Sequence, residues 1–176
     1  MSEKECIEML KTRQSIRRFT DKDIPDEVIN GIIEAALRAP SAGNRQPWRI
    51  VVVRDRDRIQ RLAAAAGGQS AVLTCNVLLG IFAIPAESEE RYGARGRNLY
   101  CIQDTAALTY ALLLAIHING LGACWVGAFD DEAVAEGFDA PADYRPVVMI
   151  PIGLYEQAPP MRSRRPLSEV VIREHF

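Results

Sequence analysis

The sequence predicts an α+β protein built around a central, mostly antiparallel sheet. Helical and strand-like segments alternate along the 176 residues, but without the regular strand–helix–strand repeat of a parallel α/β protein. Two short apolar runs, 48–53 and 77–83, have strand length, whereas the apolar segment 99–119 has helical length. No internal repeat or low-complexity linker interrupts the sequence, so we expect a single domain over residues 1–176.

In the first half of the chain, apolar spacing and stop residues define the elements. From Val28 to Leu37 apolar residues recur at helical spacing, Pro25 suits a first helical turn, and Pro40 ends the pattern. β-Branched residues favour a strand after Trp48, and Gly67-Gly68 closes the next helical segment. The predicted elements are a short helix ending near Thr12, helix 25–38, strand 48–53 and helix 55–66.

The second half is predicted to alternate in the same way. Residues 85–96 are polar, charged and glycine-containing, which favours a mobile surface loop or a partial helix. The helix predicted at 99–119 is apolar on almost every side, which indicates burial on several sides and the core of a dimer. The remaining predicted elements are strand 77–83, a helix end at Gly120-Leu121-Gly122, strand 123–127, helix 131–137 capped by Asp130, and strand 146–152.

Composition excludes several classes of function. A net charge of −2 and a pI near 5.8 give no general support for a nucleic-acid partner. With three lysines among 21 basic residues, the positive charge is mostly arginine, which favours bidentate anion recognition, although genomic base composition could give the same bias. The charged N-terminus has no apolar leader, and the apolar runs are too short or interrupted to cross a membrane. We expect a soluble, cytoplasmic protein.

Common catalytic and metal motifs are missing from the sequence. Gly120-Leu121-Gly122 lacks the third glycine of a dinucleotide fingerprint and follows a helix, and no Walker loop, His-Glu-x-x-His pair or nucleophile elbow occurs. Four cysteines without metal-type spacing are expected to be reduced structural thiols. His117 lies among apolar residues and is expected to be a satisfied helix histidine. No metal site is predicted.

Three polar segments, 13–17, 40–48 and 162–164, carry groups that bind anions or the edge of a flat heterocycle. Arginine forks and hydroxyl groups suit a phosphate, whereas amide donors and an apolar floor suit a ring. A large phosphorylated cofactor needs both kinds of group, and flavin mononucleotide (FMN) fits best.

The same segments resemble motifs of the nitroreductase-like family of FMN oxidoreductases. The resemblance covers nearly the whole chain, in order. Its motifs are Arg13-x-Ser15-x-Arg17, the Pro40-Ser41-x-x-Asn44-x-Gln46-Pro47-Trp48 loop, Tyr92 to Gly96, Gln103-Asp104, Gly120 to Phe129, and Arg162-x-Arg164. Gln14 departs from the pattern, because arginine or histidine is usual there. Residues 69–76 match only loosely, and Gln69 is left without a firm role.

The resemblance implies an intertwined homodimer with two FMN sites at its interface and the tail, about 156–176, packed on the partner. It places Arg13, Ser15, Arg162 and Arg164 on the phosphate and ribityl chain, and Arg17 near flavin N1 and the C2 carbonyl. Trp125 and Val126 would flank the ring, and Gly127 and Ala128 would offer backbone N–H groups near N5. The remaining implied contacts are Gln14 and Gln46 and, from the partner chain, Pro40, Ser41, Ala42 and Asn44.

The function that follows from the resemblance is ping-pong hydride transfer from NADH or NADPH, through flavin N5, to a nitroaromatic, quinone or similar small acceptor. No side chain need act as a general acid or base. Two alternatives stay open: a flavin-binding sensor or carrier without rapid turnover, and a reductive dehalogenase of the same family. Each motif alone also has a plain structural explanation, namely a solvated arginine face, a helix stop and turn at 40–44, and a helix C-cap at Gly120.

Overall fold

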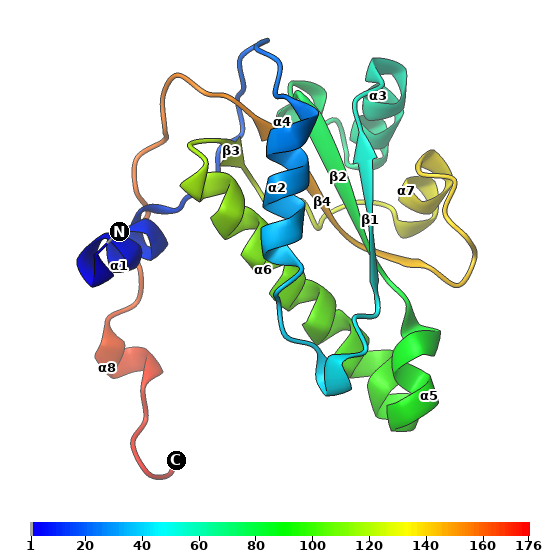
Figure 1. Cartoon of the computed structure of the whole chain (residues 1–176), viewed down its shortest axis with the longest axis vertical. Helices are drawn as coiled ribbons and strands as arrows, with labels where there is room; N and C mark the ends of the chain where they lie inside the picture. Colours follow the sequence, from blue (N-terminus) through cyan, green and yellow to red (C-terminus); the bar gives the residue numbers. More distant parts are fainter. Residues whose placement is uncertain (1) are drawn as a thin grey trace.

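A four-stranded antiparallel sheet forms the centre of the computed structural model, which describes residues 2–176. The strands are β1 (Trp48–Val53), β2 (Val77–Ala83), β3 (Gly122–Ala123) and β4 (Arg145–Gly153), in the order β1-β2-β4-β3. Every pairing is antiparallel. The sheet and its covering helices confirm the predicted α+β class (Figure 1).

Helices cover both faces of the sheet. They are α1 (Glu3–Thr12), α2 (Asp26–Ala36), α3 (Arg56–Ala65), α4 (Ser70–Leu73), α5 (Pro85–Arg95), α6 (Cys101–Ile118), α7 (Asp131–Gly137) and α8 (Leu167–Val170), with a 3₁₀ turn at Ala42–Asn44 and a π turn at Gly96–Tyr100. Side chains alternate between the faces along each strand. Leu79 therefore packs with α2 and α6, whereas Leu78 packs with α3 and α7. Because both faces are covered, every residue of β2 is buried.

Local sequence signals explain where several helices begin. Ser2 and Glu5 form a capping box at the start of α1. Asp55 and Asp130 accept hydrogen bonds from the backbone N–H three residues later, at α3 and α7 respectively. The predicted cap at Asp130 is confirmed.

Two predicted elements need correction. Of the two structures predicted for residues 85–96, a mobile loop or a partial helix, the loop is wrong: residues 85–95 form helix α5, because Pro85 occupies the first turn and Glu87 lies at the positive end of the helix dipole. The strand predicted at 123–127 is only Gly122–Ala123, since Trp125 turns out to solvent. Beyond β3, only Val126 pairs again, in an isolated bridge to Met149.

Helix α6 is the central helix of the fold. One side packs on β2 and β4, as the apolar pattern predicts, while Tyr110 and Ile118 on other sides are about half exposed. Together with α5 and the π turn it forms a helical stretch, 85–118, that is long and apolar enough to cross a membrane. Its packing against α2 and the sheet identifies it instead as the core helix of this fold.

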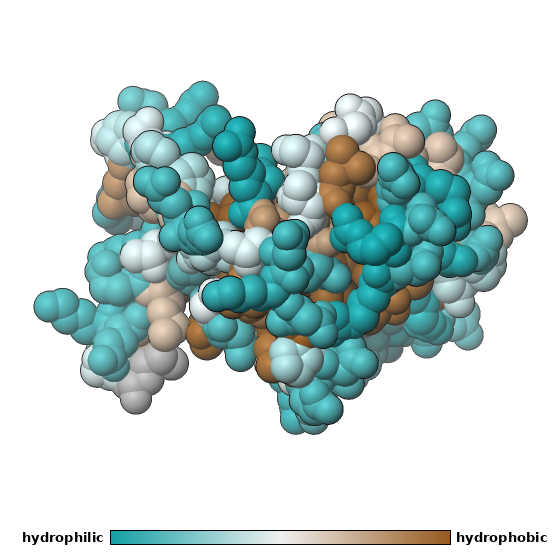
Figure 2. Space-filling view, turned by 90° about the horizontal axis from the view of Figure 1, so that it is seen from above, coloured by the Kyte–Doolittle hydropathy of each residue, from teal (hydrophilic) through white to brown (hydrophobic). Residues whose placement is uncertain are grey.

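The C-terminal tail leaves the body of the protomer. Residues 159–176 are all exposed, and α8 lies on the same side as α1, away from the sheet (Figure 1). The face seen from above is mainly hydrophilic with hydrophobic residues visible between the polar ones (Figure 2). On the tail, Leu167, Val170 and Ile172 are more than half exposed. Such an apolar tail needs a covering surface, so its packing on a partner stays a prediction.

Candidate functional site

The Arg13–Arg17 segment runs beside β3. Ile16 is 3% exposed and donates its backbone N–H to the carbonyl of Ala123 at 2.9 Å. Gly122 allows this approach, because a Cβ there would lie 2.8 Å from the side chain of Ile16. Anchoring Ile16 inward leaves Ser15 half-buried and Arg17 exposed, on the outer side of the segment.

The tail brings the third polar segment to the first. Arg13, Gln14, Ser15 and Arg17 line a pocket of about 160 Å³ together with Pro159, Pro160, Met161, Arg162 and Arg164. We call it the arginine pocket. Residues almost 150 positions apart in the chain therefore meet as the resemblance implied. The pocket shares Ser15, Arg17, Pro159 and Pro160 with a larger cavity of about 590 Å³, which also reaches Phe19 and Glu156. This volume lies in the usual range of small-molecule sites.

Four of the residues that line the arginine pocket are arginines. Within residues 2–176, no carboxylate lies at ion-pair distance from Arg13, Arg17, Arg162 or Arg164. Arg164 donates only to the backbone carbonyls of Arg162 and Ser163, at 3.3 and 3.2 Å. Clustered like charges repel one another and become favourable when an anion binds between them. The donor set, guanidinium forks with a hydroxyl, fits the phosphate of FMN.

The 125–128 segment lies next to the first motif. Arg17 is close enough to Cys124 to lower the pKa of that thiol, although burial has the larger effect and raises it. Trp125 is 42% exposed, and Gly127 and Ala128 are exposed, so these three can face a bound ring. Val126 is 2% exposed and exchanges two backbone hydrogen bonds with Met149. Its side chain points into the core, so Val126 supports the exposed residues beside it and does not itself flank a ring.

Gln69 has a partner that sequence reasoning missed. Its side-chain amide donates to the carbonyl of Ala128 at 3.1 Å and so fixes the loop that offers the Gly127 and Ala128 backbone amides. Gln69 follows two glycines with positive φ, 69° and 72° at Gly67 and Gly68. The bond to Ala128 spans 59 positions, so no local pattern in the sequence predicts it.

The 40–46 loop is rigidly held. Asp104 of α6 accepts the backbone N–H of Ala42 at 2.9 Å, and Ser41 Oγ accepts the N–H of Gln46 at 3.0 Å. Asn44 and Gln46 have positive φ, near 55° and 52°, which non-glycine residues adopt only where their surroundings hold them. Asp104 is 7% exposed, and its second oxygen is buried without a partner among the described residues. Burial raises the pKa of this carboxyl more than the Ala42 hydrogen bond lowers it.

The 40–46 loop and the Arg13 segment lie near opposite ends of α6 (Figure 1). Asp104 holds the loop near the start of the helix, whereas Arg13 shares a small pocket with His117 near its end. Thirteen residues of helix separate them, which is about 20 Å at 1.5 Å per residue. The single chain thus does not bring Pro40, Ser41, Ala42, Asn44 or Gln46 to the arginine pocket.

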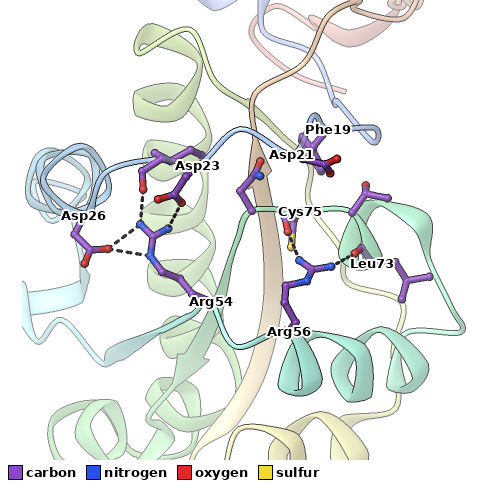
Figure 3. A pocket seen from close by; sticks show the side chains of 11 residues that line it. Phe19, Asp21, Asp23, Asp26, Arg54, Arg56, Leu73 and Cys75 are labelled. Atoms are coloured by element: carbon purple, nitrogen blue, oxygen red, sulfur yellow. Dashed lines mark hydrogen bonds and ion pairs between the residues drawn. The ribbon is translucent and has the colours of Figure 1, made fainter.

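A separate cavity of about 670 Å³ contains two other arginines (Figure 3). Arg54 contacts Asp23 and Asp26 and donates to the carbonyl of Ile24. Arg56 donates to the carbonyls of Leu73 and Cys75. Burial raises the pKa of the adjacent Cys75 thiol to about 12, so it stays protonated at neutral pH. Both guanidinium groups therefore bind groups of the chain itself and are not available to an anion.

Relatives of this chain were found by sequence and by structure. The model of the Nitroreductase family matches residues 10–74 and 66–154. A protein of Archaeoglobus fulgidus named for NADH dehydrogenase and NAD(P)H nitroreductase is 37% identical over 128 residues, which are 73% of this chain and 70% of that protein. An NADH dehydrogenase of Thermus thermophilus is 31% identical over 91% of both chains.

Solved structures give the same fold. NfrA2 of Bacillus megaterium superposes with a TM-score of 0.90 at 26% identity, over all of this chain and 76% of its own. A nitroreductase-like protein of Streptococcus mutans reaches 0.91 at 21% identity, over 97% of this chain and 98% of its own. The family match covers most of the chain, from the Arg13 segment through β4, and the predicted resemblance is confirmed. The chain belongs to the nitroreductase family of oxidoreductases.

Proposed function

We propose that this protein is an FMN-dependent NAD(P)H oxidoreductase that reduces electron-poor acceptors such as nitroaromatics or quinones. The observation that carries the proposal is the arginine pocket, where two distant segments bring together four arginines that form no ion pair within the described residues 2–176. A terminal phosphate satisfies three of them, Arg13, Arg162 and Arg164, and the adjoining cavity, which Arg17 also lines, offers room for the rest of a cofactor. The names of the relatives, NADH dehydrogenase and NAD(P)H nitroreductase, agree with a pyridine nucleotide as the electron donor.

Each part of the proposed site has its own role. When bound, FMN supplies the hydride chemistry. Arg13, Ser15, Arg162 and Arg164 bind its phosphate and ribityl chain. Arg17 places a fixed positive charge next to the ring, where it stabilises negative charge that develops on reduction. Trp125 provides an apolar surface, and Gln69 holds the backbone amides of the 127–128 segment in place. Substrates are aligned by stacking, so proximity accounts for much of the rate.

A homodimer completes this proposal. The 40–46 loop of one protomer approaches the flavin bound by the partner, and each C-terminal tail packs on the other protomer. The expected particle has twice the 19.5 kDa mass of the chain, measured by light scattering during gel filtration. A monomer that binds no FMN would contradict the shared site.

The direct test is an absorbance spectrum of the purified protein under argon, before and after addition of NADH or NADPH. We expect a flavin spectrum that bleaches within seconds and returns when a quinone or nitroaromatic is added. A flavin that stays oxidised would favour the sensor or carrier function instead. A protein that remains colourless after incubation with FMN would exclude the proposal.

A further inference from the structure

Four side chains form a cluster at the end of α5 and in the π turn that follows it. The rings of Tyr92 and Tyr100 meet edge to face, with centroids 5.2 Å apart and planes at 79°. The Arg91 guanidinium lies 5.5 Å from the centroid of Tyr92, and that of Arg95 lies 5.3 Å from the centroid of Tyr100. Arg95 Nε also donates to the Tyr100 hydroxyl at 3.0 Å. We call these four residues the Arg–Tyr cluster.

The two arginines of the cluster take no part in the ion pairs that the glutamates of α5 form. The three glutamates of this helix already bind other arginines, Glu87 with Arg49, Glu89 with Arg97 and Glu90 with Arg45. Across the described residues 2–176, no carboxylate lies at ion-pair distance from Arg91 or Arg95. Both side chains are exposed, so their charge is available to a ligand.

The Arg–Tyr cluster lies against the 40–46 loop. A Cβ at Gly43 would collide with the Tyr92 hydroxyl and would lie 3.2 Å from Arg91 Nη1. Gly43 has a φ of 56°, so the loop both needs a glycine there and brings its backbone up to these two side chains. Arg45, two residues later, is held by the carbonyl of Glu87 and the carboxylate of Glu90, which fixes the loop to α5.

We propose that the Arg–Tyr cluster binds the anionic group of a planar substrate that enters over the flavin. This inference rests on the proposed function, because it is the 40–46 loop that places the cluster beside the partner's flavin. Guanidinium groups bind carboxylate or phosphate through paired N–H donors, and tyrosine rings contact a flat molecule. The shared chemistry is an anion joined to an aromatic or nicotinamide ring. It occurs in the phosphates of the pyridine nucleotide and in a carboxylated aromatic acceptor.

The test compares the wild-type dimer with Arg91→Gln/Arg95→Gln, using steady-state kinetics under argon. The acceptors are 4-nitrobenzoate and the neutral 4-nitrobenzamide, and the donors are NADH and NADPH. Arg61→Gln, on α3, makes the same kind of charge change at an exposed position outside the cluster and serves as the matched control. Arg91→Lys/Arg95→Lys keeps the charge but loses the fork.

We expect kcat/KM for one anionic substrate class to fall about tenfold in the Gln variant, with 4-nitrobenzamide and FMN content unchanged. A fall for 4-nitrobenzoate alone would identify the acceptor's carboxylate, and a fall for NADH and NADPH would identify the nucleotide phosphates. The Lys variant should recover part of the loss. Equal kcat/KM values for every substrate in wild type and Gln variant would overturn the inference. A wild-type protein without FMN would instead overturn the proposed function and, with it, this inference.

Discussion

The two arginine-lined cavities of this protein differ in what their guanidinium groups contact. In the cavity of about 670 Å³, Arg54 forms ion pairs with Asp23 and Asp26. Arg56 donates hydrogen bonds to two backbone carbonyls there. In the arginine pocket, of about 160 Å³, Arg164 meets only two nearby backbone carbonyls of its own tail. In the larger cavity the arginines bind carboxylates or carbonyls of the chain. In the arginine pocket no carboxylate of the described residues neutralises the positive charge.

This difference shows that cavity size is a poor guide to the ligand site here. Arginines whose charge is neutralised by carboxylates of their own chain stabilise the fold, whereas a cluster of arginines without a carboxylate partner favours the binding of an anion. The two cavities should accordingly respond in opposite ways to mutation. Changes in the arginine pocket should alter FMN affinity, and changes at Arg54 should alter stability.

The largest effect is expected at Arg164. Arg164→Glu places a negative charge in the arginine pocket, so we expect the Kd for FMN to rise about 100-fold or more. Arg164→Lys keeps the charge without the fork and should raise the Kd about tenfold. Arg165→Glu makes the same charge change on the neighbouring residue, outside the pocket, and should leave the Kd within about twofold. Fluorescence titration of the apoprotein with FMN measures all three, and equal affinities for Glu and Lys would refute the phosphate role.

A smaller effect, on stability, is expected at Arg54. Arg54→Gln breaks the contacts that join the end of β1 to the 23–26 turn, including the bond to the Ile24 carbonyl at 2.6 Å. The exposed ion pairs contribute little, so most of the loss of about 1–2 kcal/mol comes from the charge-assisted backbone contact. Urea unfolding measures this loss, while the Kd for FMN should stay unchanged. A weakened FMN affinity without loss of stability would mean that the larger cavity is the ligand site.

Local signals were enough to predict most elements of the sheet. Residues 48–53 and 77–83 are strands with the predicted bounds, because β-branched composition and continuous burial act within a few residues. The strand predicted at 123–127 failed for a tertiary reason. Only Gly122 and Ala123 have β4 beside them before the chain turns Trp125 outward. The sequence did not decide between a loop and a partial helix at 85–96, because the polar residues there suit either, and their pairing with Arg45, Arg49 and Arg97 is visible only in the structure.

The candidate site was only partly readable from the sequence. Arg13, Arg17, Arg162 and Arg164 were selected through the resemblance, and the structure brings them together. Composition alone does not separate them from Arg54, since pairing with Asp23 depends on residues 31 positions apart. The Asp104 bond to Ala42 spans 62 positions and leaves no local pattern. The proposed contribution of a partner chain rests on the resemblance alone, because no local pattern in the sequence indicates which loop would cross an interface.

The smallest expected effect tests how the rigid 40–46 loop is held. Burial raises the pKa of Asp104 above its ordinary value near 3.8, so between that value and the raised one the native protein binds more protons than the unfolded chain. The free energy of unfolding therefore falls as pH rises through this window. At neutral pH the buried carboxylate is ionised, and its contribution to stability is at its lowest. Asp104→Asn keeps an acceptor for the Ala42 N–H but never ionises. Its stability relative to wild type should thus improve, by about 1 kcal/mol or less, between about pH 4 and about pH 7.

Urea unfolding at both pH values measures this change, and Asp143→Asn, at an exposed position, should show no such change. The same pair of experiments bears on the site, because the loop anchored by Asp104 is the one proposed to meet the partner's flavin. The opposite result is that the free energy of unfolding of the wild type increases relative to that of Asp104→Asn as the pH rises. It would mean that the hydrogen bond from the Ala42 N–H stabilises the ionised carboxylate more than burial destabilises it. The loop would then be held by charge, and acid would loosen it together with the flavin.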